Sequence, residues 1–305
     1  MFRTSWFPWR SLGQRNGRPR HLSSSRAGRR RSPLILEPLE DRTALSNFNA
    51  ATVSDLIADI NAANAAGGSN TITLTAPTKL PYVLTAVNNT TDGATGLPVI
   101  AAGDSLTIAG NGDTIERNKK SPAFRIFAVA GGASLALANL TVQNGFVDGF
   151  GGGILNSGTL SVSGCTLSGN SAAIGGGIMN LGTVTVQSST LSGNSAIGDG
   201  GGIANYPGGS MTITGCTVSH NSAGAHGGGI FNAGSMSINS CTVSHNAADG
   251  DGGGIYASAQ GTFLDISNSL VCNNSAMLGA DLFIDCLALV SISNSTICNT
   301  YINCG

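Results

Sequence analysis

The stretch Gly175-Gly176-Gly177-Ile178-Met179-Asn180 is one copy of the motif that decides the fold of this chain. Each glycine cluster is followed by a second motif, Leu or Val, two variable residues and Asn. The isoleucines of successive copies lie 24, 25, 27 and 25 residues apart. The glycine clusters end at Gly153, Gly177, Gly202, Gly229 and Gly254, and the second motif ends at Asn170, Asn194, Asn221, Asn246 and Asn274. Internal repeats of this length indicate a repeat architecture.

A short segment of alternating apolar residues lies between the two motifs of each repeat. Alternation with period two is typical of a β-strand with one buried face. The apolar pairs are Leu106/Ile108, Leu135/Leu137, Leu160/Val162, Val184/Val186, Met211/Ile213, Met236/Ile238, Leu264/Ile266 and Val290/Ile292. The repeat is too short for a propeller blade of ~40–50 residues and holds no helical stretch. The sequence therefore predicts an all-β parallel β-helix, a solenoid of about seven to eight coils with three short strands in each.

The repeated residues have defined roles in such a solenoid, because identical positions stack at about 4.8 Å along its axis. Stacked Leu, Val and Ile would fill the interior. The glycines would allow a positive φ at a tight corner and a close approach of neighbouring coils. The asparagines would form a ladder in which each amide binds the next coil. These structural repeat residues are Gly152, Gly176, Gly201, Gly228 and Gly253, with Asn170, Asn194, Asn221 and Asn246.

Charge is distributed unevenly along the chain, whose formal net charge is −1. Residues 1–46 hold ten basic and three acidic residues, and residues 47–305 hold five basic and thirteen acidic residues, so the two parts carry +7 and −8. No Lys or Arg follows Arg125. Because such a surface cannot neutralise phosphates, nucleic acid is excluded as a partner of the body, and anionic membranes are poor partners. The sequence predicts no transmembrane segment and no cofactor.

The first 46 residues are rich in Arg and Ser and have no hydrophobic period. They are predicted to be a disordered basic export or targeting segment outside the fold. Leu36-Glu37-Pro38-Leu39-Glu40-Asp41-Arg42-Thr43-Ala44-Leu45-Ser46 resembles the N-terminal export signature of planctomycete extracellular proteins. That resemblance implies an extracellular, cell-surface or periplasmic protein.

The repeats also carry a resemblance. They resemble the GGA(I/L/V) and FxxN repeats of chlamydial polymorphic outer-membrane proteins, and those of related right-handed β-helix proteins of environmental bacteria. They depart from that pattern with Gly in place of Ala, and with Leu or Val in place of Phe. The resemblance implies that the β-helix is right-handed and single-stranded and stands at a bacterial surface.

Residues 47–129 are predicted to form an N-terminal cap and the first coils, before the β-helix repeats of residues 130–305. Ser54 can cap the start of a helix that ends at Gly67. Residues 71–75 alternate as a strand. Because an open solenoid end exposes unpaired strand edges, a helical plug is expected there. The segment also resembles the N-terminal cap of bacterial exported β-helix proteins.

Seven cysteines are present, and five of them fall in two columns of the repeat. Cys165, Cys216 and Cys241 share one column, and Cys272 and Cys298 share the other. Parallel side chains on neighbouring rungs give poor disulfide torsions, so both columns are interpreted as stacked buried thiols. The thiols of an exported protein can be oxidised to disulfides, and the C-terminal end of the solenoid needs a covalent cross-link. The best candidates for a disulfide are therefore Cys286 and Cys304.

One group of side chains is a candidate for chemistry. The residue before the glycine cluster is Asp199, His226 and Asp251 in three successive coils. Stacking would place the two aspartates ~9–10 Å apart, and inverting glycosidases hold their two carboxyl groups ~6.5–9.5 Å apart. The same row could bind a divalent cation, or Asp and His could simply occupy a glycine-rich turn, which Asp favours. His220 and His245 occupy matching positions and are expected to stack on an outer turn.

These patterns favour a non-catalytic extracellular or cell-surface β-helix protein of structural or adhesion type. Its expected partners are cell-surface glycans or other surface proteins. Two alternatives stay open. The first is a polysaccharide-active enzyme, a glycoside hydrolase rather than a lyase, that uses Asp199 and Asp251 with His226 beside them. The second is a carbohydrate-binding module.

Overall fold

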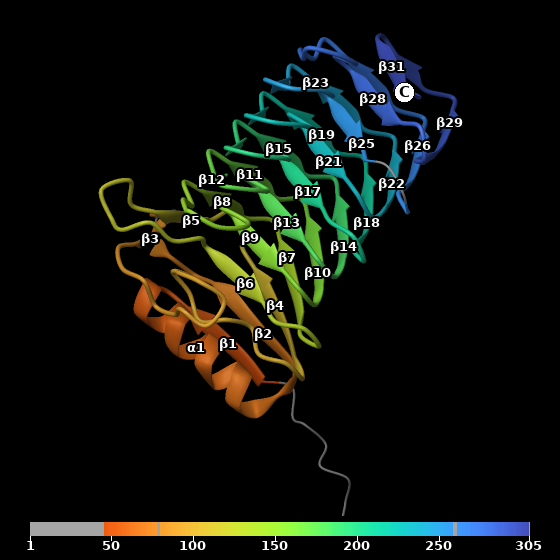
Figure 1. The fold of residues 1–305 in the computed structure, drawn as a ribbon. Helices are drawn as coiled ribbons and strands as arrows, with labels where there is room; N and C mark the ends of the chain where they lie inside the picture. The colour runs from red at the N-terminus through yellow and green to blue at the C-terminus, as the bar shows by residue number, and fades with distance from the viewer. Residues whose placement is uncertain (1–45, 78–79, 259–260, 305) are drawn as a thin grey trace, which may run out of the picture. The chain divides into compact units, whose positions relative to one another are not determined.

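The computed structural model describes residues 46–77, 80–258 and 261–304. In these residues the chain winds into a solenoid of parallel strands, with one helix at the end where it begins (Figure 1). Each complete coil contributes one strand to each of several sheets, and strands of successive coils pair in parallel. The export-like sequence, apart from Ser46, lies outside the described residues.

Two of the sheets run along most of the described chain. The first has ten strands, in the order Ser46–Ala50 (β1), Gly68–Leu74 (β2), Asp104–Ala109 (β4), Ser134–Ala138 (β7), Thr159–Ser163 (β10), Thr183–Gln187 (β14), Ser210–Thr214 (β18), Ser235–Asn239 (β22), Phe263–Ser267 (β26) and Leu289–Ser293 (β29). The second has nine strands, in the order Tyr82–Leu84 (β3), Thr114–Arg117 (β5), Thr141–Gln143 (β8), Thr166–Ser168 (β11), Thr190–Ser192 (β15), Thr217–Ser219 (β19), Thr242–Ser244 (β23), Leu270–Cys272 (β27) and Thr296–Ile297 (β30).

Two further sheets complete the coils within the described residues. One has eight strands, in the order Phe127–Val129 (β6), Ile154–Asn156 (β9), Ile178–Asn180 (β13), Ile203–Asn205 (β17), Ile230–Asn232 (β21), Ile255–Ala257 (β25), Leu282–Asp285 (β28) and Thr300–Asn303 (β31). The other has four short strands, Ser171–Ala172 (β12), Ser195–Ala196 (β16), Ser222–Ala223 (β20) and Ala247–Ala248 (β24). The four-stranded sheet forms a narrow face between the nine-stranded and eight-stranded sheets in sequence order.

Identical positions of successive coils lie over one another. The isoleucines that follow the glycine clusters pair in register and are fully buried: Ile154, Ile178, Ile203, Ile230 and Ile255. In the ten-stranded sheet, Leu160 pairs with Val184, and Val184 pairs with Met211. The solenoid predicted from the repeat is therefore confirmed, and its core is a set of parallel apolar files.

The solenoid is longer than the seven to eight coils predicted, because its first sheet has ten strands in the described residues. Phe48 pairs with Ile72, and Ile72 pairs with Ile108, so these early strands belong to the same sheet as the repeats. The glycine motif is missing from the early coils, and a long excursion separates Ile72 from Ile108. Periodicity therefore could not reveal these two coils.

The helix α1, Val53–Ala66, packs its buried face of Leu56, Ile60 and Ala63 at the N-terminal end. The predicted helical plug is present, but the predicted N-cap at Ser54 is wrong. Thr52 is the N-cap: its hydroxyl accepts from Asp55 N, and the Asp55 carboxylate accepts from Thr52 N. This reciprocal box needs an acidic or amide side chain three residues after the cap, and the residue three after Ser54 is an isoleucine. No helix in the described segments has the length and apolarity to cross a bilayer.

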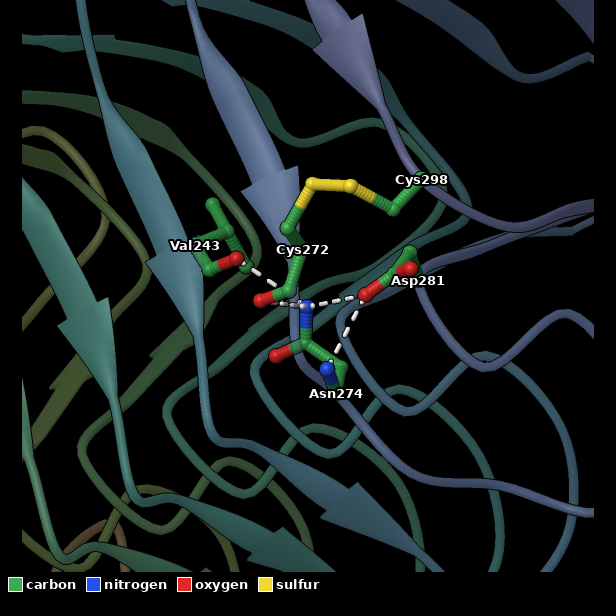
Figure 2. Close-up of a disulfide and its surroundings, with 5 residues drawn as sticks. All are labelled: Val243, Cys272, Asn274, Asp281 and Cys298. Carbon is green, nitrogen blue, oxygen red and sulfur yellow. Dashed lines mark hydrogen bonds between the residues drawn. A yellow bond between two sulfur atoms is a disulfide. The ribbon is translucent and has the colours of Figure 1, made fainter.

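Two columns of asparagine join the coils. In the first column Asn170, Asn194, Asn221, Asn246 and Asn274 are buried or half-buried, and each amide donates to the next oxygen at 2.9–3.0 Å. The column ends on the carboxylate of Asp281, which accepts from both nitrogens of Asn274 (Figure 2). The second column, with 2.8 Å bonds, contains Asn156, Asn180, Asn205 and Asn232.

The cysteines divide by position. Cys165, Cys216 and Cys241 are free and buried, as predicted. The predicted disulfide between Cys286 and Cys304 is confirmed, with its Cα atoms 4.7 Å apart.

The thiol prediction for the other column is wrong, because Cys272 and Cys298 form a disulfide (Figure 2). Their Cα atoms are 5.1 Å apart, within the range that a disulfide bridges. Cys272 stands at the end of β27, where it pairs with Ser244, and its bond to Cys298 joins it to the last coil. The free thiols of the other column bind backbone groups instead, as where Cys241 Sγ accepts from Cys216 N at 3.4 Å.

Both disulfides fasten the last coil, so their loss should loosen that coil alone. We expect the double variant Cys272→Ser/Cys298→Ser to lower the free energy of local opening by about 3 kcal/mol, as for a loop of this length. Hydrogen exchange of β30 and β31 would measure it. Cys165→Ser is the control, because serine already fills that column at Ser189 and accepts from Cys165 N. Unchanged protection of β30 in the double variant would contradict the prediction.

Candidate functional site

The candidate aspartates and histidine lie where the chain turns from the four-stranded into the eight-stranded sheet. Asp199, His226 and Asp251 precede β17, β21 and β25. Backbone hydrogen bonds hold each turn on the next: Gly200 N donates to His226 O at 2.9 Å, and Gly227 N donates to Asp251 O at 3.1 Å. The structure therefore brings the three residues into one row, one per coil, which we call the Asp–His row.

The side chains of the Asp–His row bind the backbone of the neighbouring coil. Asp199 Oδ1 accepts from His226 N at 3.2 Å, and His226 Nδ1 accepts from Asp251 N at 3.2 Å. Since Nδ1 is an acceptor, this hydrogen bond assigns the ring proton of a neutral His226 to Nε2. The Asp251 carboxylate is 4.0 Å from His226 Nδ1, and the two side chains are 23% and 37% exposed.

The second oxygen of Asp199 also has a partner from the same chain. Tyr206 directs its hydroxyl at Asp199 Oδ2, at 3.5 Å. Burial raises the pKa of Tyr206 to about 12, and the negative charge of Asp199 adds to the rise. The hydroxyl therefore stays protonated and available as a donor throughout the neutral range. Both carboxylate oxygens of Asp199 face donors of the protein itself.

A column of aromatic rings runs beside the Asp–His row on the eight-stranded sheet. The ring centroids of Tyr206, Phe231, Tyr256, Phe283 and Tyr301 are 4.9–5.5 Å apart in succession. His226 stacks on Tyr256 at 4.7 Å, so the row and the column touch. Most of the ring faces are covered by other rings, and Phe283 is only 2% exposed.

The aromatic column was missed in the sequence. Its signal is the second residue of each strand of the eight-stranded sheet, which is aromatic from β21 onward, whereas Tyr206 directly follows β17. The Tyr256 hydroxyl donates to Asp285 at 2.9 Å. Burial, together with this carboxylate, raises the pKa of Tyr256. The column thus presents tyrosine edges rather than open ring faces at the surface.

The remaining candidates lie elsewhere. His220 and His245 follow β19 and β23, with φ values of 57° and 58°, and their rings stack at 5.1 Å as expected. In the described residues, no group of three or more His, Cys, Asp and Glu side chains is placed to hold a metal ion. The Asp–His row can accept and donate hydrogen bonds at its exposed edges, and it is anchored by its contacts to the coil backbone.

The family described as right-handed beta helix region matches residues 104–275, from β4 to the coil of β27. The chain belongs to this right-handed β-helix family. The match spans the glycine motifs, both asparagine columns and the Asp–His row. The right-handed β-helix, which the repeats implied by resemblance, is therefore shown.

A solved structure supports the same fold. The crystal structure of pectate lyase Pel9A superposes with a TM-score of 0.53 at 14% identity, over 85% of this right-handed β-helix chain and 79% of that chain. At this identity the likeness concerns the fold alone. No curated protein matches the sequence.

Proposed function

We propose that this right-handed β-helix is a non-catalytic extracellular or cell-surface protein of adhesion type, whose outer faces bind glycans or surface proteins. One observation carries the proposal. Asp199, half of the only carboxylate pair that the repeat suggested, binds the His226 backbone and the Tyr206 hydroxyl with its two oxygens. A carboxylate engaged in this way is a structural acceptor in the turn.

The space between the two aspartates is also occupied. An inverting glycosidase leaves room between its carboxyl groups for a water and the sugar ring. In this chain the coil between Asp199 and Asp251 supplies His226, whose ring stacks on Tyr256 and accepts from Asp251 N. The Asp–His row is therefore built as a continuous hydrogen-bonded edge, which suits binding better than hydrolysis.

The disulfides support a place outside the cytoplasm. Cys272–Cys298 and Cys286–Cys304 both fasten the last coil. Disulfides persist in oxidising compartments and are rare in the cytoplasm. The export-like sequence of residues 36–46 supports the same localisation.

The test pairs sugar release with binding. Purified protein is incubated with a panel of neutral and acidic polysaccharides, and both released sugar and bound protein are measured. We expect binding to some of these glycans or to cell surfaces, and no sugar release. Release that disappears in Asp199→Asn but persists in Asp265→Asn, a control on β26, would establish a glycoside hydrolase and overturn the proposal. Absence of binding to every glycan and cell surface would also contradict it. Thermal unfolding of each variant verifies the fold.

A further inference from the structure

The positive charge of the body is concentrated in one place. Residues 47–305 contain five basic residues, and four of them lie in the nine-residue segment 117–125: Arg117, Lys119, Lys120 and Arg125. Arg117 ends β5, and the other three lie in the segment between β5 and β6. Because the body as a whole is acidic, this turn is where an anionic group of a ligand would be attracted.

A surface cleft of about 240 Å³ opens beside this turn. It is lined by Arg117 and Lys119 from one coil, by Asn144 and Phe146 from the next, and by Ser171 from the third. The cleft lies at the corner where β5, β8 and β11 end. The cleft is separate from the Asp–His row. In each coil the residue of that row follows the strand of the four-stranded sheet and precedes the strand of the eight-stranded sheet.

Arg117 is held rigidly in the wall of this cleft. It is 7% exposed, its Nε donates to Asn144 O at 2.9 Å, and its Nη1 donates to Ser121 O at 2.9 Å. The Cζ atom of this guanidinium lies 5.6 Å from the ring centroid of Phe146 and 5.9 Å from that of Phe124, so both rings pack on it. Burial lowers the pKa of Arg117, but an arginine remains protonated in proteins.

One donor nitrogen of this guanidinium is left over. Within the described residues, Nη2 of Arg117 has no hydrogen-bond acceptor and no carboxylate pairs with Arg117. The neighbouring Glu116 carboxylate instead accepts from Gln143 and Asn144. A preorganised guanidinium with a free N–H edge is suited to an oxyanion, because charge-assisted hydrogen bonds to such groups are strong.

The other groups of the cleft fit a sugar. Phe146 is 39% exposed and offers an apolar surface. The Ser171 hydroxyl lines the cleft and is joined to the Ser195 hydroxyl by a 3.0 Å hydrogen bond, and a hydroxyl can both donate and accept. A sugar ring has apolar C–H faces and hydroxyl edges, and it can use both. The Lys119 ammonium is exposed at the rim and adds a second positive charge.

We propose that this cleft binds an acidic sugar unit, with its carboxylate or sulfate at Arg117 and Lys119 and its ring against Phe146. The proposal rests on the proposed binding function and names its ligand class. A densely charged polyanion would be repelled by the body, whose net charge is −8 over residues 47–305. The ligand is therefore a largely neutral glycan that carries isolated acid groups.

The test uses matched glycans on the folded protein. Calorimetry compares a xylo-oligosaccharide bearing one glucuronate with its carboxyl-reduced counterpart, and a monosulfated galacto-oligosaccharide with its desulfated counterpart. We expect at least one acidic member to bind about tenfold more tightly than its neutral counterpart. The stronger of the two pairs identifies the acid as carboxylate or sulfate. Equal affinity within both pairs would overturn the proposal.

Two lysine variants separate a site from general attraction. Lys119→Gln should weaken the acidic glycan about tenfold, whereas Lys120→Gln, an equally exposed neighbour outside the cleft lining, should change it less than twofold. Phe146→Ser should weaken the acidic and neutral members alike. Equal losses of affinity in the two lysine variants would show unspecific electrostatic attraction and overturn the proposed site.

The outcomes also separate this proposal from the proposed function. If neutral glycans bind and acidic glycans bind no more tightly, the cleft proposal is wrong while the adhesion function stands. Sugar release would overturn the function without touching the acid preference.

Discussion

Replacing Gly228 by alanine should destabilise the solenoid by about 3 kcal/mol or more. The Cβ of an alanine there would lie 2.5 Å from the carbonyl oxygen of Gly253 and against the carbonyl of Ala247. Both atoms belong to the backbone of the next coil, so neither can move without breaking the interstrand register. Overpacking of this kind forces backbone shifts that commonly cost a few kcal/mol. Equilibrium unfolding in denaturant measures the change.

Gly131→Ala is the matched control for this substitution. Its Cβ would meet nothing closer than Ser157 O at 3.9 Å, and its backbone lies outside the left-handed region. Such a change leaves stability about equal, or raises it by ~0.4–1 kcal/mol through the unfolded chain. Similar losses in the two variants would mean that close approach of coils is not the reason for the glycine.

Replacing Asn221 by alanine should also destabilise the protein by about 3 kcal/mol or more. The side chain of Asn221 donates to Leu191 O and Asn246 Oδ1, and it accepts from both nitrogens of Asn194. Its removal leaves the Leu191 carbonyl and the Asn194 backbone N–H buried without their partners. Each buried group that loses its partner costs about 1–3 kcal/mol.

The comparison variant for Asn221→Ala is Thr212→Ala, at an exposed position of β18. Thr212→Ala should change the free energy of unfolding by less than about 0.5 kcal/mol. Asn221→Asp should be as harmful as alanine, because the carboxylate cannot donate to Leu191 O. A mild effect of both Asn221 variants would contradict a role for the column in stability.

The repeat itself made most of the fold predictable. The interval varies only from 24 to 27 residues, so the isoleucine file and the strand pairs follow from alignment of the copies. The first two coils lack the motif, and nothing marks Ile72 as a partner of Ile108 except its alternation. The helix was visible, but its cap depended on the reciprocal contact of Thr52 with Asp55 rather than on the first suitable side chain.

The site was predictable only where it repeats. Asp199, His226 and Asp251 occupy one motif position, so their row follows from the register. Their hydrogen bonds to Tyr206 and to the backbone depend on turn geometry that a sequence does not display. The acidic-sugar cleft was invisible for another reason. Arg117, Phe146 and Ser171 come from three coils, and Arg117 lies in one that precedes the glycine motif.

The matched register of the coils has a consequence for how such a molecule can change in size. Each coil from β9 to β21 offers its neighbours the same asparagine donors and acceptors and the same isoleucine file. Duplication or loss of one whole repeat would leave every remaining interface intact, whereas insertion of a single residue within a strand would turn side chains to the wrong face. Growth by complete turns would lengthen the outer rows in proportion, and so raise the valency of the surface without a new folding problem.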